Sequence, residues 1–173
     1  MEPMEYFKTT FDRYPLAGLT IYVKDVELPE EEAVKYRPGF DFTDINPTDA
    51  TRLLGGPAAS CRFTILSNQM GEEGKNDRFG AVRFPAFKRY KVLDNYTSRG
   101  RRQILLLHVP SEWSFFRSFE LQDDARLVRA CRAIFEEWLV ERPVPVLTER
   151  EWRENNSYPM YYDFAGPDGF FGS

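Results

Sequence analysis

The sequence predicts a single α+β domain over residues 1–173, with a central antiparallel or mixed sheet of about five strands. Three observations predict it. Runs rich in β-branched and aromatic residues occupy the middle of the chain, the longest helical pattern follows them, and no repeat or long linker divides the sequence. We expect one long amphipathic helix, residues 121–142, on a face of the sheet, with short helices at the periphery.

Five segments have the composition of strands. Each is rich in Val, Ile, Thr, Tyr or Phe, and Gly, Pro, Asn or Ser residues separate them. They are residues 19–28, 61–67, 79–84, 89–96 and 102–109. The last two flank Thr97-Ser-Arg-Gly100, which has the residues of a tight turn, so they predict a β-hairpin.

The long helix is indicated by apolar residues at spacings of three, four and seven, which form one stripe. The stripe consists of Leu127, Val128, Cys131, Ile134, Phe135, Trp138 and Leu139. Acidic residues in the first turn suit the helix dipole, and Pro143 ends the helix. Asn46-Pro47 predicts a short helix that stops at Gly55-Gly56, and the capping box Thr148–Glu151 predicts another.

Composition excludes several classes of protein. The longest apolar run, Ile104–Leu107, is far shorter than the roughly 20 residues of a membrane helix. The acidic N-terminus does not resemble a signal peptide, so we expect a soluble, cytoplasmic protein. Cys61 and Cys131 are isolated and are expected to be buried apolar groups. With His108 as the single histidine they offer no zinc-ligand spacing, and we expect neither a metal nor a cofactor.

His108 ends an apolar strand and has two interpretations. It could act as a general base for Cys61 or for a serine. Alternatively, it is a strand-end imidazole that is hydrogen-bonded to a neighbour. No Gly-x-Ser-x-Gly motif is present and neither cysteine lies in a known nucleophile motif, so we interpret His108 as structural.

Charge is segregated along the chain. Residues 75–102 contain 9 basic and 2 acidic residues, a net charge of +7, whereas the chain as a whole carries −4. Strand alternation places Arg89 and Lys91 on one face, with Tyr90 and Val92 on the other. Such cations suit an acidic protein surface, or nucleic acid through phosphate attraction and base stacking. Alternatively, the acidic segments of the same chain neutralise them.

The sequence therefore favours a non-catalytic protein-interaction module, such as an inhibitor, an immunity-type protein or an accessory protein. Its partner would be an acidic protein surface; nucleic acid is less favoured because the overall pI is about 5.2, and the oligomeric state is left open. The expected partner-binding residues are Lys88, Arg89, Lys91, Arg99, Arg101 and Arg102. The alternative is an enzyme whose site assembles distant carboxylates, tyrosines or His108. A third hypothesis is a binder of nucleic acid or anionic ligands through residues 83–102.

Overall fold

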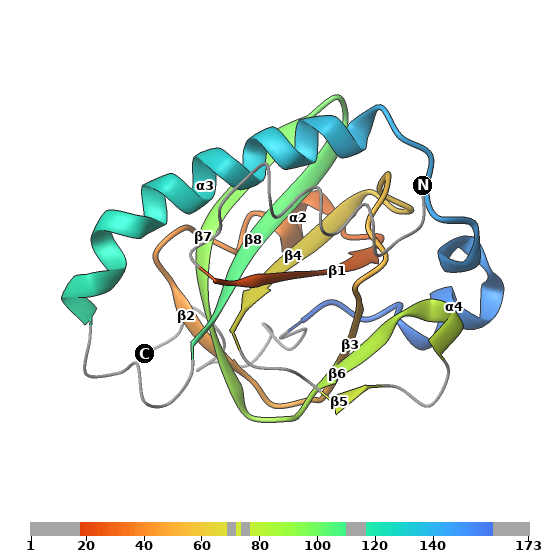
Figure 1. Ribbon diagram of the computed structural model, residues 1–173, viewed down its shortest axis with the longest axis horizontal. Helices are drawn as coiled ribbons and strands as arrows, with labels where there is room; N and C mark the ends of the chain where they lie inside the picture. The colour runs from red at the N-terminus through yellow and green to blue at the C-terminus, as the bar shows by residue number, and fades with distance from the viewer. Residues whose placement is uncertain (1–17, 69–71, 74–76, 110–116, 161–173) are drawn as a thin grey trace.

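The computed structural model describes residues 18–68, 72–73, 77–109 and 117–160 (Figure 1). Helices and strands alternate irregularly along these ranges. In chain order the elements are β1 (Thr20–Val26), α2 (Glu30–Ala33), β2 (Asp41–Asp44), β3 (Thr48–Thr51), β4 (Cys61–Ser67), β5 (Glu72–Glu73), η1 (Asp77–Phe79), β6 (Ala81–Phe84), β7 (Lys88–Ser98), β8 (Arg101–Val109), α3 (Arg117–Leu139), η3 (Pro145–Thr148) and α4 (Arg150–Asn155).

The fold is dominated by one sheet of eight strands in the order β2-β7-β8-β4-β1-β3-β6-β5. The pairing of β4 with β8 is parallel and the other pairings are antiparallel, so the sheet is mixed. The prediction of about five strands with one long helix is therefore wrong. The missed strands β2, β3 and β5 have four residues or fewer, too short for a sequence pattern to reveal.

The short helix predicted from Asn46-Pro47 is also wrong, because the chain forms strand β3 there. Thr48 of β3 pairs with Phe84 of β6. Ala50, also in β3, is fully buried. Pairing with a distant strand thus overrides the local helix-start signal, as tertiary contacts often do.

One face of the sheet is covered by α3, whose side chains pack with those of β1, β4, β7 and β8. The apolar residues of this layer include Ile21, Leu66, Leu105, Phe135 and Trp138. Burying side chains of this size is worth roughly 1.5–3 kcal/mol each, so this layer supplies much of the stability of the fold.

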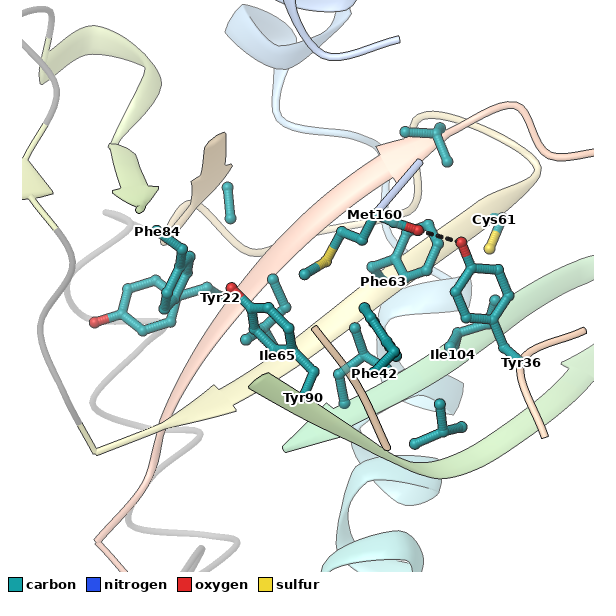
Figure 2. Close-up of a cluster of buried hydrophobic side chains, with 14 of the residues drawn as sticks. Tyr22, Tyr36, Phe42, Cys61, Phe63, Ile65, Phe84, Tyr90, Ile104 and Met160 are labelled. Carbon is teal, nitrogen blue, oxygen red and sulfur yellow. Dashed lines mark hydrogen bonds between the residues drawn. The ribbon is translucent and has the colours of Figure 1, made fainter. Parts of the chain in front are cut away.

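The opposite face carries a second, aromatic core (Figure 2). Its residues come from β1, β2, β3, β4, β6, β7 and β8, and also from Tyr36 and Met160, which lie outside the sheet. Several rings meet edge to face, including Tyr22 with Phe84 at 5.3 Å between centroids. The two faces of the sheet are thus buried in different ways, one by a helix and one by loops and rings.

The sheet curls so that its two ends approach each other (Figure 1). Residues 85–87 join β6 to β7, and residues 45–47 join β2 to β3. In the order of the sheet, the two strands of each pair lie near opposite ends. At the β2–β7 end, the Phe87 amide donates to the Asp44 carbonyl at 2.7 Å and extends the pairing of β2 with β7 as far as these connections. The region where the two ends of the sheet approach each other, which we call the seam, is where the candidate site lies.

The predicted hairpin is confirmed: β7 and β8 pair antiparallel from Arg89–Val109 to Ser98–Arg101. Arg99 and Gly100 form its turn with φ values of 51° and 76°, the positive values that two-residue hairpin turns require. The prediction of two buried, isolated cysteines is confirmed as well, since Cys61 and Cys131 are both free and buried. Within the described ranges, no helix has the length and hydropathy to span a membrane.

Candidate functional site

A polar pocket of about 480 Å³ opens at the seam of the sheet, a volume within the usual range for small-molecule sites. Four separate stretches of sequence contribute to it: β1, the β2–β3 region, β6, and the end of α4 with the segment that follows it. Its lining residues are Lys24, Asp44, Asn46, Pro47, Thr48, Asp49, Arg83, Asn155, Tyr158 and Pro159. We refer to it as the Lys24 pocket.

Lys24 is brought to this pocket by the alternation of β1. Tyr22 and Val26, two residues to either side, belong to the aromatic core, so Lys24 points to the same face. Its side chain is only 5% exposed, and its Nζ donates to the Asp49 carbonyl at 3.5 Å. Burial lowers the pKa of the Lys24 amine to about 8, although the negative charges of Asp49 and Asp44 oppose the shift. The neutral amine is therefore far more accessible near physiological pH than in an ordinary lysine, although the protonated form still predominates.

Asp44 is the buried carboxylate of the pocket, with 2% exposure. It points inward because it follows Phe42, a core residue, at a spacing of two on β2. Its Oδ1 accepts from the Asn46 amide at 3.1 Å and its Oδ2 accepts from the Thr48 hydroxyl at 3.4 Å. These bonds fix the carboxylate across the turn that joins β2 to β3.

Arg83 and Asp49 form an ion pair at the more exposed side of the pocket. The Arg83 Nε lies 2.8 Å from Asp49 Oδ1, and a second guanidinium nitrogen lies 3.1 Å from Oδ2. The pairing is fixed by the register of β3 and β6, in which the two residues are directly opposite. The pocket therefore combines two acids and two bases, and its neutral overall charge suits a polar substrate better than a highly charged one.

The predicted partner-binding residues do not converge on one surface. Three of them pair with acids of the same chain: Arg89 with Asp41, Lys91 with Asp124 at 2.7 Å, and Arg102 with Glu30 at 2.7 Å. Lys88 and Arg89 lie at one end of the hairpin, and Arg99, Arg101 and Arg102 lie at the other. Arg99 and Arg101 are exposed at the turn, whereas Arg102 is half-buried and also donates to Asn95 at 2.5 Å.

His108 lies outside the Lys24 pocket. Its Nδ1 is 2.8 Å from the Ser67 hydroxyl, and its ring packs against Phe84 and Tyr90 with centroids 5.5 Å apart in both cases. Both His108 and Ser67 are buried. Cys61 lies at the other end of β4 from Ser67, and burial raises the pKa of its thiol well above its usual value, so the thiol stays protonated.

The sequence analysis did not identify the residues of the Lys24 pocket. One feature of the sequence could have identified two of them, Lys24 and Asp44. Lys24 lies between the buried residues Tyr22 and Val26 at a spacing of two, and Asp44 follows the buried Phe42 at the same spacing. A charged residue on the inward face of a strand is costly to bury and is therefore a candidate for function. Within the described residues, no group of three or more His, Cys, Asp or Glu side chains is arranged to hold a metal ion.

Comparison with known proteins gives structural neighbours only. No family model matches the chain, and no curated protein matches it. Among solved structures it is similar to the ADP-ribosyltransferase HopU1 of Pseudomonas syringae, with a TM-score of 0.46, 9% identity, and coverage of 53% of this chain and 45% of that one. It is also similar to the Vis toxin, an ADP-ribosyltransferase from Vibrio splendidus, with a TM-score of 0.42, 12% identity, and coverage of 53% and 49%.

A third similar structure is the C3 exoenzyme of Clostridium limosum, with a TM-score of 0.45, 11% identity, and coverage of 61% of this chain and 67% of that one. The match spans about half the length of HopU1 and Vis. HopU1 and Vis are enzymes, and this finding contradicts the expectation that the chain is a non-catalytic protein-interaction module. The same finding contradicts the expectation that the chain is not an enzyme.

Proposed function

We propose that the chain is an enzyme whose active site is the Lys24 pocket. The observation that carries this proposal is the burial of an amine and a carboxylate, Lys24 and Asp44, in the wall of a polar pocket. Burying two charges is costly, and a protein gains from it when the groups do chemistry. The site is assembled from distant segments, in agreement with the alternative interpretation of the sequence.

In this proposal Lys24 transfers protons. Its neutral amine accepts a proton from an O–H or N–H group of the substrate and becomes an ammonium ion. The Asp49 carbonyl, 3.5 Å from Nζ, and the negative charges of Asp44 and Asp49 stabilise that ion. Asp44 is held by Asn46 and Thr48 and presents its carboxylate as a hydrogen-bond acceptor that orients the substrate. The substrate class is a small, polar molecule with an acidic O–H or N–H hydrogen.

Turnover of a panel of small polar compounds, followed by NMR, tests the proposal. The panel also contains NAD⁺, to test directly whether the chain shares the activity of HopU1 and Vis. We expect Lys24→Met to lower the turnover of the accepted compound by about 100-fold or more, the usual contribution of a general base. Lys35→Met is the matched control, because Lys35 pairs with Glu32 on the surface and should leave turnover unchanged.

Two results would contradict the proposal. One is a Lys24→Met protein that is folded and as active as the parent. The other is a parent protein that neither converts any compound nor shows a change in the Lys24 side-chain signal with any of them.

We also propose that the hairpin tip, Arg99 and Arg101, contacts an acidic protein surface. Both side chains are exposed, and the two like charges flank Gly100 at the turn of the hairpin. A glutamate-rich peptide serves as the probe, and its association should weaken with salt and with the double change of Arg99 and Arg101 to Gln. The matched control changes Arg150 and Arg153 to Gln; equal weakening by both pairs would show that net charge alone matters.

A cytoplasmic location is the third proposal, and the free state of Cys61 and Cys131 supports it. Both thiols are buried and unpaired, as is usual in reducing compartments. We further propose that residues 1–173 act as a single domain. Fractionation of cells that express the tagged chain tests the location, and limited proteolysis tests the single domain by the absence of a stable smaller fragment.

A further inference from the structure

The segment Asn155–Met160 forms one wall of the Lys24 pocket. Asn155, Tyr158 and Pro159 line the pocket; Asn155 is the last residue of α4 and the other two follow the helix. The segment is anchored at two other residues. Asn156 is buried and its Nδ2 donates to the Trp152 carbonyl at 2.9 Å, while Met160 is fully buried in the aromatic core. Tyr158 and Pro159, which line the pocket, thus lie between two residues that hold the segment in place.

Tyr36 provides the anchor at Met160. Its hydroxyl donates to the Met160 carbonyl, a contact between residues 124 positions apart in the sequence (Figure 2). Both residues are fully buried, so the bond joins two polar groups in the interior of the protein. Tyr36 is therefore the point at which the aromatic core holds the pocket wall.

Tyr36 is itself held firmly. Its ring meets Phe42 and Phe63 edge to face, with centroids 6.1 Å and 5.2 Å away. Its backbone carbonyl accepts from Asn95 Nδ2 at 2.9 Å. A side chain fixed by its ring and by its backbone can transmit its position to the segment that it binds.

We propose that Tyr36 is a positioning residue for the Lys24 pocket, which holds the 155–160 wall in place through its hydrogen bond to Met160. Tyr36 does not line the pocket, so it acts through that segment. The relevance of Tyr36 to catalysis rests on the proposed function of the pocket. Its positioning of the wall can be tested independently of that function, because a separate measurement reports it.

That measurement is the pKa of the Lys24 amine. The groups around Lys24 are Asp44 on β2, Asp49 on β3, Arg83 on β6 and the polar atoms of the 155–160 segment. Desolvation is the largest cause of the lowered pKa of Lys24. Release of the wall admits water, so the pKa of the amine should rise towards its ordinary value of 10.5.

The experiment is a pH titration of the Lys24 ¹³Cε signal in protein labelled with ¹³C-lysine, with Lys24→Arg used for assignment. The parent should titrate near pH 8. Tyr36→Phe keeps the ring and its packing, and we expect it to raise the pKa of Lys24 by about 1 unit or more as the wall loosens. Tyr96→Phe is the matched control, because it removes a tyrosine hydroxyl bonded to Glu136 on the helix side of the sheet and should leave the Lys24 titration unchanged.

Met160→Ala is a second variant, which removes the side chain buried in the aromatic core and should also raise the pKa of Lys24. Unchanged titration in both Tyr36→Phe and Met160→Ala would overturn the proposal, as would an equal shift in Tyr96→Phe. A shift in the first two, together with full turnover by Lys24→Met, would leave the positioning role intact and refute the proposed function alone. If both roles hold, Tyr36→Phe raises the KM for the accepted compound and displaces its pH–rate profile to higher pH.

Discussion

Arg62 and Asp25 form a bidentate ion pair beneath helix α3. The Arg62 Nε lies 2.7 Å from Asp25 Oδ1, and a second guanidinium nitrogen lies 2.9 Å from Oδ2. Arg62 is 1% exposed, donates to the Gly55 carbonyl at 2.6 Å, and lies over the Trp138 ring at 4.8 Å from its centroid. One side chain thus joins two strands, the loop before β4 and the end of the helix.

We predict that Asp25→Asn lowers the free energy of unfolding by about 3–5 kcal/mol, because it leaves the Arg62 charge buried without a counter-ion. Urea unfolding measures the loss. The double change Asp25→Leu with Arg62→Met, which removes both charges, should cost less than Asp25→Asn. A single variant that unfolds at the same urea concentration as the parent would contradict the prediction.

Lys24 should make stability depend on pH in the alkaline range. Its pKa is about 8 in the folded protein and 10.5 is its ordinary value, so between these values the unfolded chain binds a proton that the folded chain has released. Stability therefore rises as pH increases from 8 to 10.5, by about 3 kcal/mol for 2.5 units at 1.36 kcal/mol each. Lys24→Met should lack this rise and should be more stable than the parent at pH 7. Parallel pH profiles for the two proteins would show that the amine is not desolvated.

His108→Gln should reduce stability modestly and leave turnover within about twofold of the parent. His108 is buried against Ser67 and two rings, and a lost buried hydrogen bond costs about 1–3 kcal/mol. Thermal unfolding and the turnover assay described above measure the two effects. Ser67→Ala should have a similar effect on stability. A well-folded His108→Gln protein whose turnover fell 100-fold would assign His108 to catalysis.

Substitutions of the two arginines of the hairpin tip and of the neighbouring Arg102 should differ in their effect on stability. Arg102 is half-buried and bonds to both Glu30 and Asn95, so Arg102→Gln should cost about 1 kcal/mol. Arg99→Gln and Arg101→Gln should change stability by less than about 0.5 kcal/mol, as exposed substitutions usually do. Chemical denaturation of the three single variants tests this, and an equal loss in all three would contradict it.

The sequence predicted the parts of the fold that depend on local chemistry. The β7–β8 hairpin was predictable because its turn residues and its strands adjoin in the chain. The four-residue strands β2 and β3 were not, because their pairing partners β7 and β6 lie 30 or more residues away. A strand that short has no pattern of its own, and its partners decide whether it forms.

The candidate site was harder to predict for the same reason. Lys24, Asp44 and Tyr158 come from three distant segments, and only the curl of the sheet brings them together. The basic run drew attention because charge is easy to count, yet Arg89, Lys91 and Arg102 are paired within the chain. The inward-facing charge of Lys24 was the more informative signal. It can be recognised from the alternation of β1, because Lys24 shares a face of the strand with the apolar residues Tyr22 and Val26.

The seam has a consequence for the order of folding. The β7–β8 hairpin joins neighbouring residues and can form early, whereas the closure of the seam unites segments that are widely separated along the chain. Contacts of high sequence separation carry the larger loop-closure cost and slow the folding reaction. We therefore expect the pocket to be among the last parts of the molecule to form. An intermediate with a complete hairpin would still have Lys24 in water, with an ordinary amine and no site around it.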